Sequence, residues 1–343
     1  MGQRKITTFG STRSFGTLQQ SFGDCFLEIY NKLKTKTKSF GGYYIFSRPV
    51  IMITDPDLIR NILSINFTNF RDRQLYLDEE SDPLGAHLVS LQGEKWKIMR
   101  AKLTPTFTSG KMKMMFHTLL SCSKSLGTIL DEHIKIKEAL DIKDIFARLT
   151  TDTIASCAFG LDCNSLKDPE TGFRRYGKKI FSVNFKDAIL NFLANDYPLI
   201  LKLFKIPLTS PDITDFFMNT LKQTVDYREK NKVHRRDFLD LLIRLKNNQS
   251  VFDDLIESSA EGSGSITFNE LAAQAFVFFS AGFENTSTTL NFTTFELVRN
   301  PSIQEKLRKE INTILKEHNN ELTYEGIMEM KYMTKVVNGK HIT

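Results

Sequence analysis

Three polar side chains, Glu284, Asn285 and Thr286, directly follow the apolar stretch FVFFSAGF at residues 276–283. A carboxylate, a carboxamide and a hydroxyl can accept or donate hydrogen bonds to a reactant, and a carboxylate buried without partners is costly. Gly282 stands just before them in a segment whose pattern predicts a helix, where glycine costs about 1 kcal/mol relative to alanine. Close packing of another helix is the simpler explanation of a single glycine. The polar block beside it favours a groove that faces a flat ligand and a small polar reactant.

A second set of side chains that could bind a ligand lies in the segment GEKWKIMRAKLTPTF, residues 93–107. Its spacing places Trp96, Met99, Arg100 and Leu103 on one side of a predicted helix. The indole N–H and the guanidinium are both hydrogen-bond donors, so Trp96 and Arg100 together could bind an anion. In the alternative interpretation, Trp96 packs in the core while Arg100 extends to solvent.

The same segment contains Lys95, Lys97 and Lys102, with Glu94 as its acidic residue. This basic surface could dock an acidic partner, although a solvated helix face explains any one of these lysines. The net charge of the whole chain, +6, is too small to indicate a nucleic-acid partner. The four cysteines have neither paired zinc-type spacing nor a secreted pattern, which favours a reduced compartment without structural zinc.

The elements that must position these residues are mostly helical. Two apolar runs in residues 40–56 predict a small β-hairpin near the N-terminus, and the pattern after it is almost wholly helical. Thr267 and Glu270 form a predicted capping box, and Asn300-Pro301 predicts the end of a helix of about 33 residues. The sequence therefore predicts a mainly α fold with a small β-sheet. Since no linker rich in proline, glycine and serine divides the 343 residues, we expect a single domain over 1–343.

Taken together, these motifs resemble those of the cytochrome P-450 monooxygenases. The resemblance rests on Trp-x-x-x-Arg in EKWKIMRAKLTPTF, on TSGKMKMMF after it and on Ala-Gly-x-Glu in the long helix. Further similar stretches are MITDPDLIRNIL, FRDR, DPLGAHLVSLQGEKW and RRDFLDLLIRLK. The resemblance covers about residues 9–338 and is to the insect-type microsomal branch, which is associated with xenobiotic oxidation. It implies the cytochrome P-450 fold.

The resemblance also implies roles for individual residues. Trp96 and Arg100 would hold the propionates of haem b, and Ala281 with Gly282 would form a shallow groove over the haem face where oxygen binds. The catalytic positions would be Glu284, in proton delivery, with Asn285 and Thr286; the family usually has threonine where this chain has Asn285. The substrate pocket would be lined by Leu88, Leu91, Phe276, Phe279 and Phe283.

The implied partners are a small hydrophobic substrate and an NADPH-dependent reductase, which would dock on the basic face of Lys95, Lys97 and Lys102. NADPH would serve the chain only through that reductase, and no nucleic acid is expected. By family, the protein would associate with the endoplasmic reticulum membrane on its cytosolic side.

The sequence departs from the family pattern at both ends. It lacks the N-terminal anchor, the Glu-x-x-Arg pair and the Phe-x-x-Gly-x-x-x-Cys-x-Gly loop that supplies the axial cysteine. The resemblance stops at Asn338, before an atypical tail at 339–343. We therefore expect an incomplete fold with no metal ligand, and an inactive chain. The alternatives are a non-catalytic truncated isoform or incomplete gene product, or a haem-free helical module that binds hydrophobic ligands.

Overall fold

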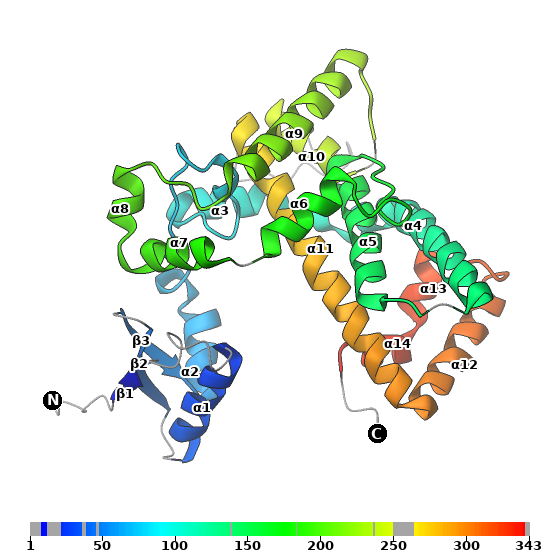
Figure 1. Cartoon of the computed structure of the whole chain (residues 1–343), viewed down its shortest axis with the longest axis horizontal. Helices are drawn as coiled ribbons and strands as arrows, with labels where there is room; N and C mark the ends of the chain where they lie inside the picture. The colour runs from blue at the N-terminus through cyan, green and yellow to red at the C-terminus, as the bar shows by residue number, and fades with distance from the viewer. Residues whose placement is uncertain are drawn as a thin grey trace. The chain divides into compact units, whose positions relative to one another are not determined.

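The architecture is mainly helical with a small sheet near the N-terminus, which confirms the predicted fold class (Figure 1). It comes from a computed structural model that describes residues 8–11, 22–35, 39–45, 48–137, 139–182, 184–235, 237–249 and 264–339. Of the atypical tail predicted at 339–343, residues 340–343 lie outside these ranges. The chain divides into two compact units, and the single domain expected from the sequence stays a prediction.

The first unit contains Met1–Tyr76, Ser90–Lys95 and Phe185–Ile206. Its sheet has the order β1 (Thr8–Ser11), β2 (Phe40–Ile45), β3 (Arg48–Ile53); β1 pairs with β2 in parallel and β2 with β3 antiparallel, so the predicted hairpin is present. A Cβ on Gly41 of β2 would lie 2.2 Å from Cδ2 of Leu33. Helix α1 (Phe22–Thr35) therefore packs on the sheet where only glycine leaves room. The other helices are α2 (Pro56–Arg60), η2 (Asn61–Ile65), η3 (Phe67–Asn69), α7 (Phe185–Asp196) and α8 (Pro198–Leu203).

The second unit contains Leu77–Val89, Trp96–Asn184 and Pro207–Thr343. Its helices are η4 (Pro83–Gly85), η5 (Thr104–Phe107), α4 (Ser109–Ile136), α5 (Ile142–Ile154), η6 (Ala155–Phe159), α6 (Gly172–Phe181), α9 (Pro211–Asn231), α10 (Phe238–Lys246), α11 (Phe268–Arg299), α12 (Pro301–Glu317), α13 (Tyr324–Glu329) and α14 (Lys331–Val337). Helix α3 (Gly93–Leu103) has residues in both units. None of the helices in the described ranges combines the length and the apolar character needed to span a bilayer.

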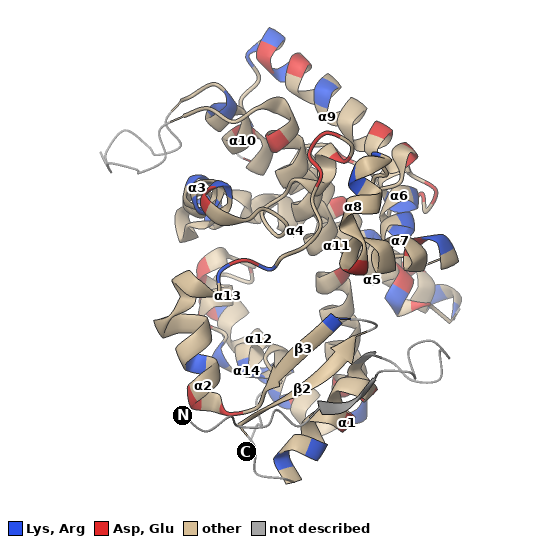
Figure 2. Ribbon diagram, turned by 90° about the vertical axis from the view of Figure 1, so that its left-hand side faces the viewer, with Lys and Arg blue, Asp and Glu red and all other residues tan. Residues whose placement is uncertain are grey.

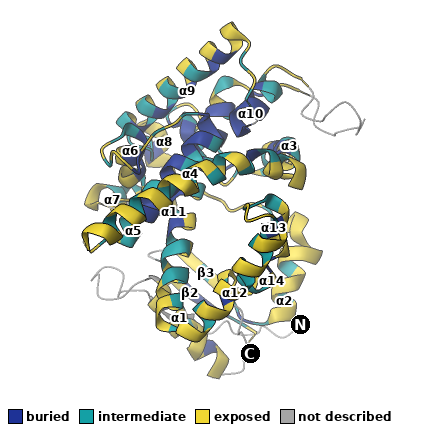
Figure 3. Ribbon diagram, turned by 90° about the vertical axis from the view of Figure 1, so that its right-hand side faces the viewer, coloured by how far each residue is buried: buried dark blue, intermediate teal, exposed yellow. Residues whose placement is uncertain are grey.

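The core of the second unit surrounds the first half of α11, where buried residues are continuous (Figure 3). This half contacts α5, α6, α9 and α10. Phe279 of α11 meets the rings of Phe159, Phe173 and Phe217 at centroid distances of 6.0, 5.5 and 5.2 Å. Such tilted and edge-on aromatic contacts add stability beyond the burial of apolar area.

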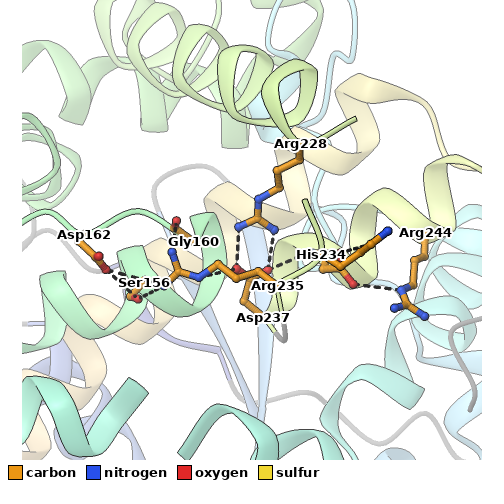
Figure 4. Close-up of polar contacts among 9 residues, drawn as sticks. Ser156, Gly160, Asp162, Arg228, His234, Arg235, Asp237 and Arg244 are labelled. Atoms are coloured by element: carbon orange, nitrogen blue, oxygen red, sulfur yellow. Dashed lines mark hydrogen bonds and ion pairs between the residues drawn. The ribbon is translucent and has the colours of Figure 1, made fainter. Parts of the chain in front are cut away.

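A buried ion pair joins α9 to α10 (Figure 4). Arg228 donates two hydrogen bonds to the carboxylate of Asp237, at 2.9 and 2.6 Å, and both side chains are less than a tenth exposed. Asp237 also caps α10 by accepting from the N–H of Asp240. Gly160, with φ of +65°, ends η6 against this pair, because a Cβ there would lie 1.8 Å from Nη2 of Arg228. One ion pair thus fixes three elements around the core.

Candidate functional site

The long helix α11 carries most of the predicted site residues, and its start has the predicted capping box. Oγ1 of Thr267 accepts from the N–H of Glu270 at 3.1 Å, and the N–H of Thr267 donates to the Glu270 carboxylate at 2.7 Å. The helix ends at Arg299, with Asn300 and Pro301 next. It is buried on nearly every side up to Phe276, and it exposes one side from Ala281 onward. The polar block therefore begins where the helix acquires an open face.

Gly282 lies against α5. A Cβ at this position would come within 2.6 Å of Cδ1 and 2.8 Å of Cγ1 of Ile154. Nearby, Thr150 of α5 donates from Oγ1 to the backbone carbonyl of Phe283 at 3.0 Å. These contacts give the glycine a packing reason, which is the alternative that the sequence left open. Its predicted place beside a haem face stays a prediction.

The open face of α11 is formed by Ala281 and Asn285, which are one turn apart and both exposed. Nδ2 of Asn285 donates to the carbonyl of Ala281 at 3.2 Å. This bond uses one amide hydrogen and leaves the second hydrogen and Oδ1 for other partners. Glu284 is half-buried beside them, and Thr286, which is exposed, points to a different side of the helix. The three consecutive side chains therefore point to different sides of the helix, each about 100° from the next, and Thr286 lines the cavity described below.

Helix α3 carries Trp96 and Arg100, the pair predicted to bind an anion. Its buried residues are Met99 and Leu103, whereas Trp96 is half-buried and Arg100 is exposed. Among the residues that the structure describes, the Arg100 guanidinium has no hydrogen bond or ion pair. A guanidinium with all its donors free is suited to a carboxylate ligand.

The end of α3 and the turn after it are attached to α11. Phe107 of η5 packs on Phe278 with a centroid distance of 5.0 Å, four residues before Gly282. Lys102 donates to the carbonyl of Ser265, just before α11 begins, at 3.3 Å. The helix that carries Trp96 and Arg100 therefore continues into a turn that contacts α11 about one helical turn before the open face.

A cavity of about 460 Å³ lies on the α5 side of Gly282. Its walls come from α4, α5, α10, α11, α13, η5 and η6, and are almost wholly apolar; they include Phe107, Leu120, Cys157, Phe278, Gly282 and Thr286. Trp96 and Arg100 are not among the lining residues. The cavity is therefore separate from the predicted anion-binding pair, Trp96 and Arg100.

The predicted substrate-pocket residues lie in different surroundings. Phe279 and Phe283 are 0% and 2% exposed within the aromatic cluster of the core, and Phe276 is next to Phe217 in the same cluster. Leu88 is half-buried in a loop on α11, and Leu91 belongs to the first unit. The structure thus places the three phenylalanines in the core, and their role as substrate walls stays a prediction.

Burial keeps the thiols of two cysteines in the second unit, Cys157 and Cys163, protonated at neutral pH. Burial raises the pKa of Cys157 to about 11 and that of Cys163 to about 12. No cluster of three or more metal-binding side chains occurs among the described residues.

Sequence reasoning missed three residues that shape the site: Ile154 opposite the glycine, Thr150 on the Phe283 carbonyl, and the buried Gln274 of α11. The signal for Gln274 was present, since it interrupts the apolar run at 272–283. Nothing in the local sequence singles out Ile154 or Thr150, because their importance depends on which helix they face.

Comparison with known proteins agrees with this architecture. The family model described as Cytochrome P450 matches residues 8–338. "Probable cytochrome P450 6a20" of Drosophila melanogaster is 42% identical over 319 residues, which cover 92% of this chain and 62% of that protein. "Cytochrome P450 6A1" of Musca domestica is 39% identical over 319 residues, covering 92% of this chain and 60% of that protein.

The chain spans about 60% of the length of these curated relatives. Over nearly all of its own length, however, both the family model and the relatives match it. The resemblance drawn from the Trp-x-x-x-Arg and Ala-Gly-x-Glu motifs is therefore confirmed at the level of the family. The chain belongs to the cytochrome P450 family.

Proposed function

We propose that this chain is the haem-binding part of a monooxygenase that oxidises small hydrophobic compounds, including xenobiotics. Membership of the cytochrome P450 family supports the reaction class. The observation that carries the proposal is the exposed, unpaired guanidinium of Arg100, on a helix whose following turn packs on α11 just before Ala281. A cation and a small-residue helix face are what a flat dianionic ligand requires.

The residues of α3 and α11 fit haem b. Arg100 would bind a propionate carboxylate through its free donors, with the Trp96 indole beside it. Ala281, with its single methyl group, would let the flat ring approach α11, and Gly282 would keep that turn of α11 close to α5. Haem b, when bound, would supply the oxygen-activating chemistry.

Proton handling falls to Glu284, Asn285 and Thr286 in this proposal. Asn285 would hold the Ala281 carbonyl with one N–H and donate the other to a ligand on the open face. Since an amide does not relay a proton as a hydroxyl does, Glu284 would exchange protons with solvent at its carboxylate. Thr286 stands about 100° further round the helix, where it lines the cavity.

The chain's own thiols are not proposed as iron ligands. The thiol of Cys157 lines the cavity, which neither Trp96 nor Arg100 lines, so it lies apart from the proposed haem site. A haem-loaded sample of this chain is therefore expected to lack a thiolate-type spectrum with carbon monoxide, and the chain alone is expected to be inactive as an oxygenase.

The proposed electron donor is an NADPH-dependent reductase that docks on α3, where lysine and arginine recur along the helix (Figure 2). Helical spacing places Lys95 and Lys102 within about 20° of one another and Lys97 on the opposite side. Lys95 and Lys102 would therefore form the docking pair, and Lys97 would contribute only to the positive electrostatic potential around the helix. The same proposal includes association with the cytosolic face of the endoplasmic reticulum.

Trp96 is the chain's one tryptophan, so its fluorescence tests the proposal directly. Haemin added to the full chain should quench this emission with one-to-one stoichiometry. Arg100→Ala should weaken binding roughly tenfold or more, because a charge-assisted contact is worth about 1.5–3 kcal/mol. Arg100→Lys should restore part of the affinity, and Arg299→Ala, at an exposed arginine of α11, serves as the control. Equal affinity of Arg100→Ala and the control would contradict the proposal.

The cavity of about 460 Å³ favours a second candidate, a haem-free site for a small apolar ligand. In that case the haem-free chain should bind 1-aminoanthracene. Leu120→Trp, which fills the cavity, should abolish this binding, and Arg100→Ala should leave it unchanged. Displacement of the probe by haemin would instead favour a single shared site.

A further inference from the structure

The carboxamide of Gln274 is buried in the most apolar part of α11. Gln274 is 0% exposed, as are the neighbouring Leu271, Ala272, Ala273 and Ala275. A buried amide without hydrogen bonds destabilises a fold, so a buried glutamine is expected to have partners. Those partners show which segment the Gln274 side chain holds in place.

The partners of Gln274 are backbone groups of a loop far away in the sequence. Its Oε1 accepts from the N–H of Leu88 at 2.9 Å, and its Nε2 donates to the carbonyl of Ala86 at 3.4 Å. Because the Leu88 N–H needs an acceptor, these partners define which way the amide faces. The side chain thus pairs with residues 86 and 88 as a neighbouring backbone strand would.

The same loop has a second attachment at its other end. Asp82, 4% exposed, accepts from the N–H of Gly85 at 3.1 Å and from the N–H of Thr209 at 2.9 Å. Between the two attachments, Leu84 is fully buried where η4 contacts α11. The loop at 82–88 is therefore fixed to α11 by Gln274 and to the segment before α9 by Asp82.

We infer that Gln274 is a positioning residue that determines substrate selectivity, because it sets the course of the 82–88 loop and so the place of Leu88. The inference rests on the proposed function, since Leu88 affects selectivity only if this loop borders the substrate pocket. The fixed part is the backbone on both sides of His87, and the half-buried side chain of Leu88 is the part that a substrate would meet.

Amide hydrogen exchange of Leu88 in the full chain tests the attachment without haem. Gln274→Met keeps the size of the side chain and removes both hydrogen bonds, so the Leu88 protection factor should fall roughly tenfold or more. Thr151→Val is the matched control, because the buried Thr151 hydroxyl bonds only within its own helix, to the Ala147 carbonyl. An unchanged protection factor in Gln274→Met would overturn the inference.

Gln274→Glu distinguishes a side chain that positions the 82–88 loop by its hydrogen bonds from one that only fills space in the core. The ionised carboxylate can accept from Leu88 but places an oxygen against the Ala86 carbonyl, whereas the neutral acid can donate to that carbonyl. Protection of Leu88 should therefore be low at high pH and recover as the pH falls. A protection factor that is independent of pH in this variant would contradict the two-bond geometry.

Selectivity is measured with imidazole and 4-phenylimidazole on the haem-loaded chain. Gln274→Met should change the ratio of their two dissociation constants at least threefold while leaving that of imidazole unchanged. An unchanged ratio, despite lost Leu88 protection, would overturn the selectivity role. Failure of the unaltered chain to bind haem would contradict the proposed function, and the Leu88 exchange data would still decide the attachment.

Discussion

Replacing Gly282 by alanine tests the contact between α11 and α5. The added Cβ would meet the Ile154 side chain at 2.6 and 2.8 Å, which is closer than carbon atoms approach in proteins. Isoleucine is branched at Cβ and has little freedom to turn away, so either its χ1 rotamer or the helix spacing must change. The substitution should therefore destabilise the protein.

The size of the effect follows from two opposing contributions. Alanine is the better helix former by about 1 kcal/mol, and crowding the Ile154 side chain costs about 1–3 kcal/mol. Gly282→Ala should thus lower the free energy of unfolding by about 0–2 kcal/mol. Gly127→Ala is the matched control in α4, because the new Cβ would have no atom within 4 Å apart from its chain neighbours and the backbone of its own helix, and it should raise the free energy of unfolding by about 1 kcal/mol.

A double-mutant cycle in urea isolates the contact. Ile154→Ala alone should cost about 2–5 kcal/mol, and in that background the Cβ at 282 has room. Gly282→Ala should then become stabilising, with a coupling of about 1–3 kcal/mol between the two positions. Additive effects, or a Gly282→Ala variant as stable as Gly127→Ala, would refute the packing explanation of the glycine.

Three further predictions concern stability. Asp237→Ala leaves the buried Arg228 without its carboxylate and should cost about 3–5 kcal/mol in urea unfolding, and a loss below about 1 kcal/mol would contradict the buried pair. The pKa of Cys157 is raised from 9.0 to about 11, so its contribution to stability is complete below pH 9 and is lost as the pH rises towards 11. Cys157→Ala should flatten this part of the stability profile, which denaturation at several pH values would show. Thr267→Ala should cost about 1 kcal/mol and speed amide exchange in the first turn of α11, whereas an unchanged first turn would exclude the capping box.

The parts of the site that the sequence predicted are those governed by local chemistry. The capping box depends on residues three apart, and the end of α11 depends on the residue before a proline, so Thr267, Glu270 and Asn300 could be assigned without a fold. Spacing within one helix grouped Arg100 with Met99 and Leu103, but those two are buried and Arg100 is exposed, as the alternative interpretation had it.

The parts that the sequence did not predict depend on contacts between distant segments. Burial of Phe279 could be expected from its apolar run, but its partners come from η6, α6 and α9. Gln274 could be noticed as a polar residue in an apolar helix, yet its partner Leu88 is 186 residues away. Gly282 had two readings in the sequence, and only the position of Ile154 supplies the packing contact.

The central claim is that haem lies against both Arg100 on α3 and the open face of α11. Paramagnetic broadening measures this most directly, by comparing amide spectra of the full chain with ferric haem and with diamagnetic zinc protoporphyrin. The amide signals of Arg100 and Asn285 should both broaden, while Arg299, about 21 Å further along the helix, keeps its signal. Broadening at Arg100 alone, or at neither residue, would contradict the account.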